Sequence, residues 1–99
     1  MTEQTARASW GGALIAEAAA YRAVEGNVYF PPHTVRHGHL RPSSHTSVCP
    51  WKGIAHYYDV VVGDRTNANA AWYYPDPKPA AAEIKDHVAF WKGVAVTTT

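Results

Sequence analysis

The clearest pattern of apolar and polar positions in the chain begins at Lys52. Side chains on a β-strand alternate between two faces, so this run places residues 52, 54, 56, 58, 60 and 62 on one face and 55, 57, 59 and 61 on the other. Pro50 and Gly53 both bend the chain at its start, because proline restricts its own conformation and that of the preceding residue. We therefore expect a central strand up to Val62 with an irregular beginning.

Shorter apolar or aromatic runs, separated by glycine, proline and asparagine, predict further strands before and after this one. The expected strands lie at residues 8–10, 13–17, 20–25, 28–30, 70–74, 87–90 and 94–96. One helix over residues 13–24 is the alternative for the second and third strands, since alanine favours helices. Residues 32–35 and 79–84 are expected to form short helical turns with proline near the start. Residues 36–48 are expected to form an irregular connection with a short strand near Leu40.

Length and composition indicate a single small domain. A chain of 99 residues forms one domain with a modest core. Its four Trp and six Tyr residues suit both a small core and a ligand pocket, because these side chains bury a large area and keep a polar group. The expected fold is mostly β, a single domain over residues 8–96 with two short helical turns, a frayed N-terminus over 1–7 and a tail over 97–99.

Charge and the N-terminal sequence argue against several classes of partner. Nine Lys and Arg residues against eight Asp and Glu give a net charge of +1, without the basic run that nucleic-acid binding usually needs. No apolar run approaches the length of a membrane span, and the first residues lack the features of a secretory signal. The one cysteine excludes an internal disulfide and fits a reducing cytoplasm.

Cys49 and Lys52 are the first candidates for chemistry. The thiolate is the reactive form of cysteine, and a cation nearby lowers the pKa of a thiol. Both side chains could converge at the bend and act as nucleophile or acid/base. Two other interpretations stay open: an inert buried thiol with Lys52 paired to Glu25 or Asp59, and a non-catalytic site in which Lys52 holds an anionic group.

The chain has six histidines, at positions 33, 37, 39, 45, 56 and 87. His37 and His39 have a spacing that a metal could use, but no cysteine or carboxylate lies nearby in sequence, so no metal site and no cofactor are expected. His56 lies within the central strand and is the best general acid/base if it faces a concave side, because histidine titrates near neutral pH. A hydrogen-bonded core histidine is the alternative.

Aromatic residues provide the walls of a candidate ligand site. Tyr57, Trp72 and Tyr74, with Trp51, could line a pocket, and Trp72 and Tyr74 project together from one strand. Tyr57 lies on the opposite strand face from Lys52 and His56 if the strand is regular. We expect the irregular start near Gly53 to redirect Lys52 toward Tyr57, which leaves His56 as the weakest member of the site.

Several motifs together resemble a known family. The run from Cys49 to Tyr57 fits a Cys-Pro-aromatic-Lys-Gly-x-Ala-x-Tyr signature. Further motifs fit in the same order: Ile15-Ala16-Glu17, Val24-Glu25-Gly26, Tyr29-Phe30-Pro31, Ala71-Trp72-Tyr73-Tyr74-Pro75 and Val88-Ala89-Phe90. Over residues 8–96 the chain resembles the small bacterial proteins catalogued as domain of unknown function 427.

The resemblance implies a tent-like β domain whose curved antiparallel sheets meet around a concave, aromatic-lined space. Relatives of this architecture carry Cys-x-x-Cys pairs for structural zinc, and a single cysteine departs from that pattern. The family sometimes carries a nucleotidyltransferase label, which gains no support here. The chain has neither a glycine-rich phosphate loop nor a carboxylate pair for magnesium.

Two functions remain as hypotheses. In the first, the chain binds a small anionic or aromatic molecule through Lys52, Tyr57, Trp72 and Tyr74, with Cys49, Lys52, His56 and Glu25 able to catalyse a reaction. In the second, it is a non-enzymatic interaction module whose aromatic residues form the core. A homodimer is one way to cover the edges of a β domain of this size.

Overall fold

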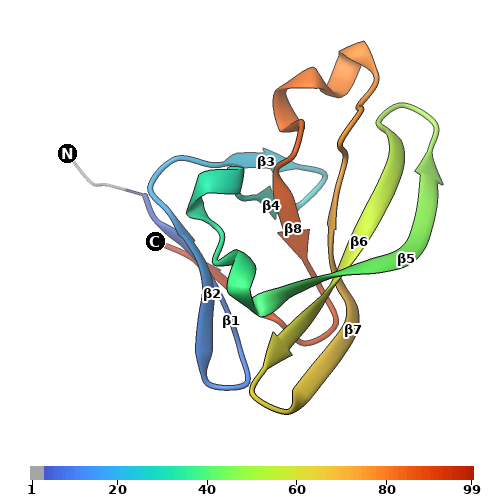
Figure 1. Cartoon of the computed structure of the whole chain (residues 1–99). Helices are drawn as coiled ribbons and strands as arrows, with labels where there is room; N and C mark the ends of the chain where they lie inside the picture. The colour runs from blue at the N-terminus through green and yellow to red at the C-terminus, as the bar shows by residue number, and fades with distance from the viewer. Residues whose placement is uncertain (1–3) are drawn as a thin grey trace.

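The structure is a computed structural model that describes residues 4–99, and β-sheet dominates it (Figure 1). Three antiparallel sheets are present among these residues. The first has the order β2 (Ala13–Ala18), β1 (Ala6–Trp10), β9 (Ala95–Thr98). The second pairs β3 (Arg22–Val24) with β4 (Asn27–Tyr29). The third has the order β5 (Leu40–Cys49), β6 (Gly53–Val62), β7 (Arg65–Tyr73), β8 (Val88–Phe90).

Three short 3₁₀ turns complete the described chain: η1 (Pro32–Thr34), η2 (His37–His39) and η3 (Pro79–Ile84). The first and last confirm the two helical turns expected at proline, whereas η2 was not predicted. The alanine-rich segment forms strands β2 and β3, so the alternative helix over residues 13–24 is wrong. Pairing of β2 with β1 overrides the helical preference of alanine there. No helix of residues 4–99 is long and apolar enough to cross a membrane.

The mostly β, single-domain, antiparallel fold is confirmed, although β7 begins at Arg65 and not at residue 70, and the largest departure lies in the middle of the chain. Residues 40–49 form a ten-residue strand, not an irregular connection. This strand is the edge of its sheet and is largely exposed, so no apolar alternation marks it in the sequence. A register shift between Pro42 and Thr46 takes the chain past the proline, which cannot donate to a ladder.

The sheet at the termini extends further than expected. β1 begins at Ala6 and β9 ends at Thr98, and these two residues are register partners. Residues 6–7 and 97–98, expected as frayed or tail segments, therefore lie in strands. Of the rest of the predicted frayed end, residues 4–5 precede β1 without regular secondary structure, and residues 1–3 lie outside the described residues.

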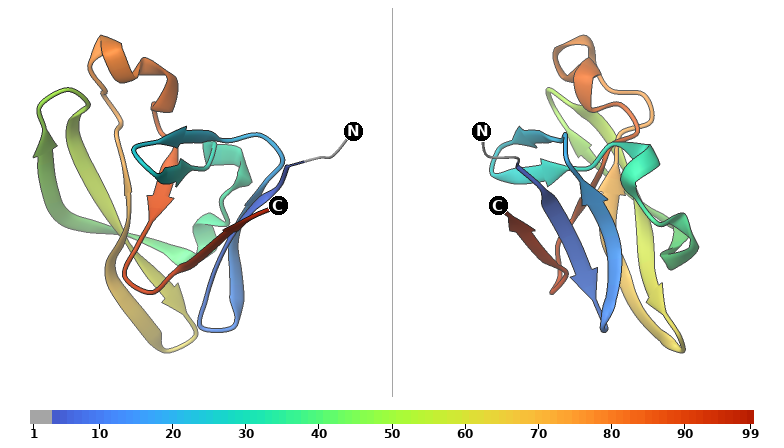
Figure 2. Two further views of the ribbon diagram at one scale, coloured as in Figure 1. Left: turned by 180° about the vertical axis from the view of Figure 1, so that it is seen from behind. Right: turned by 90° about the vertical axis from the view of Figure 1, so that its left-hand side faces the viewer.

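The two larger sheets approach each other at one end and separate at the other, which gives the tent-like shape (Figures 1 and 2). At the closed end, the Arg65 guanidinium lies 4.9 Å from the centre of the Trp10 ring. The strands of the third sheet divide the core into two clusters. On β8, Val88 and Phe90 belong to the first cluster and Ala89 to the second, because neighbouring side chains of a strand point to opposite faces.

Alternation holds along β6, and the irregularity lies in its partner strand β7. Ala55 and Tyr57 belong to the second core cluster, and Val60, which points to the opposite face, belongs to the first. The register with β7 shifts between Tyr58 and Val60. The extra residues of this bulge belong to β7, where Asn69 has a positive φ of 56°. The bulge bends β7 and breaks its alternation, since the adjacent residues Ala70 and Ala71 both pack in the first cluster.

Candidate functional site

A hollow of about 150 Å³ lies on the face of the third sheet that carries the second core cluster, and aromatic rings form most of its wall. Its lining residues are Lys52, Tyr57, Trp72, Tyr74 and Trp91. Tyr57 and Trp72 are register partners on β6 and β7, so their side chains project from the same face. Tyr74 follows Trp72 by two residues and returns to that face. The alternation of two neighbouring strands therefore builds this wall.

Lys52 reaches the hollow because β6 begins irregularly. Cys49 and Gly53 are register partners, so residues 50–52 form a three-residue hairpin loop and Lys52 precedes the regular strand. Gly53 has a φ of 116° and packs against the backbone of residues 76–78. The Lys52 carbonyl accepts a hydrogen bond from the Lys78 N–H at 2.9 Å. The expected irregular start at Gly53 is present, and Lys52 lies with Tyr57 although their strand parity differs.

The ammonium group of Lys52 is buried in an aromatic environment and paired with Glu25. Lys52 is 6% exposed, and its Nζ donates a hydrogen bond to Glu25 Oε1. The same nitrogen lies 5.3 Å from the Trp51 ring centre, 5.6 Å from Tyr74 and 6.0 Å from Tyr29. Aromatic faces at such distances attract a cation. The carboxylate and the rings together compensate for the water that Lys52 loses on burial.

The pair keeps both groups charged near neutral pH. Burial alone would lower the pKa of Lys52, but the hydrogen bond from its ammonium to Glu25 and the nearby phenols of Tyr29 and Tyr74 raise this pKa overall. The hydrogen bond with Lys52 is the main reason why the pKa of Glu25 lies below its ordinary value. Burial raises the pKa of Tyr74 to about 12, so its phenol stays neutral. Lys52 is therefore a protonated donor and not a free amine.

Glu25 occupies a backbone position that disfavours most side chains. It lies with Gly26 in the two-residue loop between β3 and β4, and their φ angles are 54° and 79°. Positive φ at both positions is typical of a type I′ turn, where asparagine or glycine is preferred. A glutamate in this conformation costs backbone energy. Its contact with Lys52 is the observed feature that offsets this strain.

Tyr29 does not line the hollow but packs against Trp72, which does. It is fully buried on β4, and its hydroxyl accepts a hydrogen bond from Trp72 Nε1 at 3.2 Å. The two rings meet edge to face, with centres 6.3 Å apart. Tyr29 thus holds the Trp72 indole in place and also faces the Lys52 ammonium. Its role in the site was not predicted, although its motif belongs to the resemblance described above.

Trp91 is the second residue that the sequence interpretation missed. It follows β8 directly and is 46% exposed, with its ring centre 5.8 Å from that of Trp72. Its indole N–H donates to the Asn69 carbonyl at 2.6 Å. The Asn69 N–H in turn donates to Asp59 Oδ1 at 2.9 Å, which stabilises the bulge. Strand parity was the sequence signal that could have identified Trp91. Ala89 packs in the second cluster, and Trp91, two residues later, shares its face when the strand is extended.

The predicted site residues are only partly brought together. Lys52, Tyr57, Trp72 and Tyr74 line the hollow, while Glu25 and Trp51 contact the Lys52 ammonium. Cys49 is a free thiol at the end of β5 that packs against the second core cluster.

His56 points away from the hollow, to the other face of β6. Its ring centre lies 5.9 Å from that of Tyr73, a partner on β7. Asp59, the other predicted partner of Lys52, is instead 3.5 Å from Arg41. Neither His56 nor Asp59 therefore lines the hollow.

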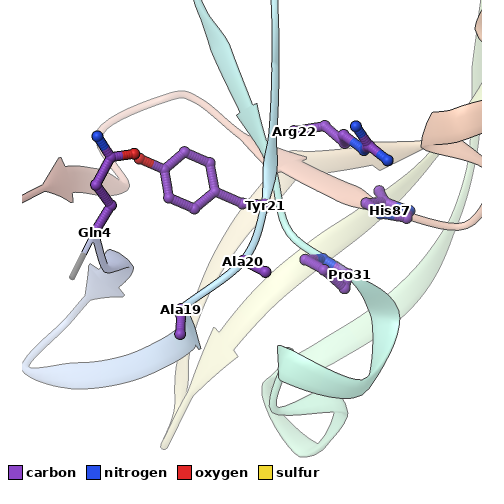
Figure 3. A pocket seen from close by; sticks show the side chains of 7 residues that line it. All are labelled: Gln4, Ala19, Ala20, Tyr21, Arg22, Pro31 and His87. Carbon is purple, nitrogen blue, oxygen red and sulfur yellow. The ribbon is translucent and has the colours of Figure 1, made fainter. Parts of the chain in front are cut away.

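A second, larger hollow of about 510 Å³ lies between β1, the loop after β2, and the beginning of β8 (Figure 3). Its lining residues are Gln4, Ala19, Ala20, Tyr21, Arg22, Pro31 and His87. Arg22 is exposed and lies 3.8 Å from Glu83. None of the predicted site residues lines this hollow, and no buried charged group does. The smaller hollow is therefore the better candidate site, despite its volume.

A metal site has no support among residues 4–99. No group of three or more His, Cys, Asp or Glu side chains in this range could hold a metal ion. His37 and His39 lie on the turn η2, where His37 Nε2 is 3.0 Å from the Pro32 carbonyl and His39 Nδ1 is 2.9 Å from the Val61 carbonyl. Both imidazoles therefore make hydrogen bonds to the backbone.

Comparison with known proteins identifies the family of the chain. No curated protein matches the chain. The motifs that form the hollow and its ion pair fall within a family match that spans residues 1–99. Because this match covers the whole chain, the protein belongs to the family described as Domain of unknown function (DUF427).

Proposed function

We propose that this protein binds a small planar molecule, aromatic or anionic, in the hollow beside Lys52. The observation that carries the proposal is a buried, protonated lysine on an otherwise aromatic wall. A buried cation is costly to maintain in a domain of this size, and a purely structural core has no need of one. Aromatic walls with one fixed polar group are typical of small-molecule sites.

The size of the hollow limits the ligand. A cavity of about 150 Å³ accommodates benzene in an engineered protein core, and the hollow beside Lys52 has a similar volume. One ring with a small substituent is therefore the expected ligand. Tyr57, Trp72 and Trp91 supply ring faces and edges for stacking, and Lys52 supplies a hydrogen-bond donor.

The arrangement supports binding better than acid/base catalysis. A catalytic base must release and accept a proton near the working pH, whereas Lys52 stays protonated beside Glu25. His56 is on the opposite face of the sheet, and Cys49 lies beside the hollow without lining it. An enzymatic role through Cys49 remains a proposal, and a thiol-reactivity profile against pH tests it. A thiol that stays unreactive up to alkaline pH would remove Cys49 as a nucleophile.

Protein NMR with single-ring probes tests the binding proposal. Benzamide and benzoate are titrated into the ¹⁵N-labelled protein, with the indole N–H signals of Trp72 and Trp91 as reporters. We expect at least one probe to shift both signals, and Trp91→Ala to weaken its affinity about fivefold through lost stacking. Val48→Ala is the control, because Val48 is 76% exposed and does not line the hollow. Absence of shifts at both indoles, or shifts confined to the hollow around Arg22 and His87, would reject the proposal.

An interaction module is the second candidate, and one observation favours it. Val48 and Ile54 are register partners on β5 and β6 and are 76% and 53% exposed. Two exposed apolar side chains side by side suit a protein contact. A partner complex, including a homodimer, that survives Trp91→Ala but is lost in the double variant Val48→Ser, Ile54→Ser would favour this function.

The single free thiol supports a reducing, cytoplasmic location as part of either proposal.

A further inference from the structure

We propose that the hollow selects an uncharged ring that carries a carbonyl group, and that Glu25 is the residue that excludes carboxylates. This inference rests on the proposed function and narrows its ligand class. It follows from the charge of the ion pair, from the free donors of Lys52 and from the walls of the hollow. Glu25 acts here as a specificity-determining residue at the edge of the site, since it contacts Lys52 but does not line the hollow.

The charge available to a ligand is close to zero. The ammonium of Lys52 and the carboxylate of Glu25 are in direct contact and neutralise each other. The other titratable groups that influence Lys52 are the phenols of Tyr29 and Tyr74, and burial keeps the phenol of Tyr74 neutral. A lysine alone would attract an anion, but a lysine already paired with a carboxylate presents a dipole.

Lys52 nevertheless keeps donors for a ligand. An ammonium group has three N–H donors, and Glu25 accepts from one of them. Among residues 4–99, no second hydrogen-bond acceptor contacts Lys52 Nζ, which instead lies near the rings of Tyr29, Trp51 and Tyr74. A carbonyl oxygen in the hollow would provide the missing acceptor without bringing a charge.

A carboxylate in the same position would meet Glu25. Two acceptors on one ammonium, each about 2.8 Å from the nitrogen, lie about 4.6 Å apart at the tetrahedral angle. At that separation the repulsion between two carboxylates offsets most of the attraction of the second carboxylate to Lys52. The ring walls of Tyr57, Trp72 and Trp91 add a further penalty, since a charged ligand loses its hydration there.

The test compares two probes of nearly the same shape, neutral benzamide and anionic benzoate, at pH 7 and constant ionic strength. Dissociation constants are measured from the Trp72 and Trp91 indole signals for the wild type, Glu25→Gln and Glu83→Gln. Glu83 is the matched control, because it is an exposed carboxylate near Arg22 and does not line the hollow. A second variant, Glu25→Asn, also removes the charge and suits the positive φ at this position.

We expect the wild type and Glu83→Gln to bind benzamide about tenfold more tightly than benzoate. Loss of the carboxylate in either Glu25 variant should raise the affinity for benzoate about tenfold and change that for benzamide less than threefold. Benzoate binding to the wild type as tightly as benzamide, or an unchanged ratio in both Glu25 variants, overturns the inference and leaves the proposed function intact. Absence of binding by both probes overturns the proposed function itself, and this inference with it.

Discussion

At the scale of single residues, the ion pair between Lys52 and Glu25 is the main electrostatic feature of the molecule. One partner is buried, whereas the side chain of the other is 53% exposed. Loss of the lysine leaves a carboxylate that water can reach, while loss of the carboxylate leaves a buried cation. The two partners are therefore unequal, and Glu25 is the one that solvent, salt or a ligand can reach.

The pair should make stability depend on pH in a defined window. The pKa of Glu25 is lowered from its ordinary value of 4.5, so its contribution is present above about pH 4.5 and is lost as pH falls through the lowered native value. The pKa of Lys52 is raised from 10.5, so its contribution is present below pH 10.5 and is lost as pH rises through the raised native value.

Urea unfolding of the wild type and Lys52→Met at a series of pH values measures this effect. The difference in free energy of unfolding between the two proteins should be constant from about pH 5 to pH 10 and shrink at both extremes. Added salt should reduce this difference modestly, because ions can screen the exposed carboxylate but do not reach the buried lysine. A difference that stays constant down to pH 2 would contradict the assigned pKa shift of Glu25.

At the scale of elements, two irregular segments place the site residues. The three-residue loop between β5 and β6 turns Lys52 toward the hollow. The bulge at Asn69 in β7 provides the carbonyl that orients Trp91. Both segments interrupt regular alternation, and bulges commonly redirect side chains near functional sites.

Gly53→Ala tests the first of these segments. Its φ of 116° is accessible to glycine but strained for alanine, so we expect a loss of about 1–3 kcal/mol in the free energy of unfolding. An added Cβ would also lie 3.4 Å from the Asp76 carbonyl oxygen, which is ordinary contact, so backbone strain is the main cause. Gly38→Ala is the control, since a Cβ added at Gly38 would meet no atom outside its chain neighbours within 4 Å, and its φ is not positive. Equal stability of the two variants in chemical denaturation would contradict the role of Gly53.

At the scale of the whole molecule, Phe30 joins the β3–β4 hairpin to the third sheet. It is fully buried, forms an isolated bridge with Val88 through two backbone hydrogen bonds of 2.8 and 2.9 Å, and contacts the Phe90 ring at 5.6 Å. The hairpin also carries Glu25 and Tyr29, so this connection keeps the ion pair and the Trp72 support in position. Stability and site geometry therefore depend on the same packing.

Phe30→Ala should cost about 3–5 kcal/mol in the free energy of unfolding, which is a large fraction of the stability of a small domain. The reason is the cavity that would replace a fully buried ring between the hairpin and the sheet. Val48→Ala, at a 76% exposed position, should change stability by less than about 0.5 kcal/mol. A similar melting temperature for both variants would show that Phe30 does not carry this connection.

Much of the fold was predictable because local patterns and tertiary packing agree. Alternation identified β6, the prolines marked η1 and η3, and glycine turns separated the short strands. β5 was not predictable, since an edge strand exposed to solvent has no buried face to impose an apolar pattern. The ends of β1 and β9 depend on each other across 92 positions, from Ala6 to Thr98, and no local signal marks such a pair.

The sequence by itself determined the family, the β class and four of the residues that line the hollow, because strand parity and one motif are local properties. These four residues are Lys52, Tyr57, Trp72 and Tyr74. Only the tertiary structure decided that Glu25 and not Asp59 pairs with Lys52 and that Trp91 joins the wall, whereas strand parity already put His56 on the opposite face from Tyr57. The physical reason is that a three-residue loop and a bulge break the period of two on which parity depends. Contacts between segments distant in sequence then select the partners that meet at the hollow.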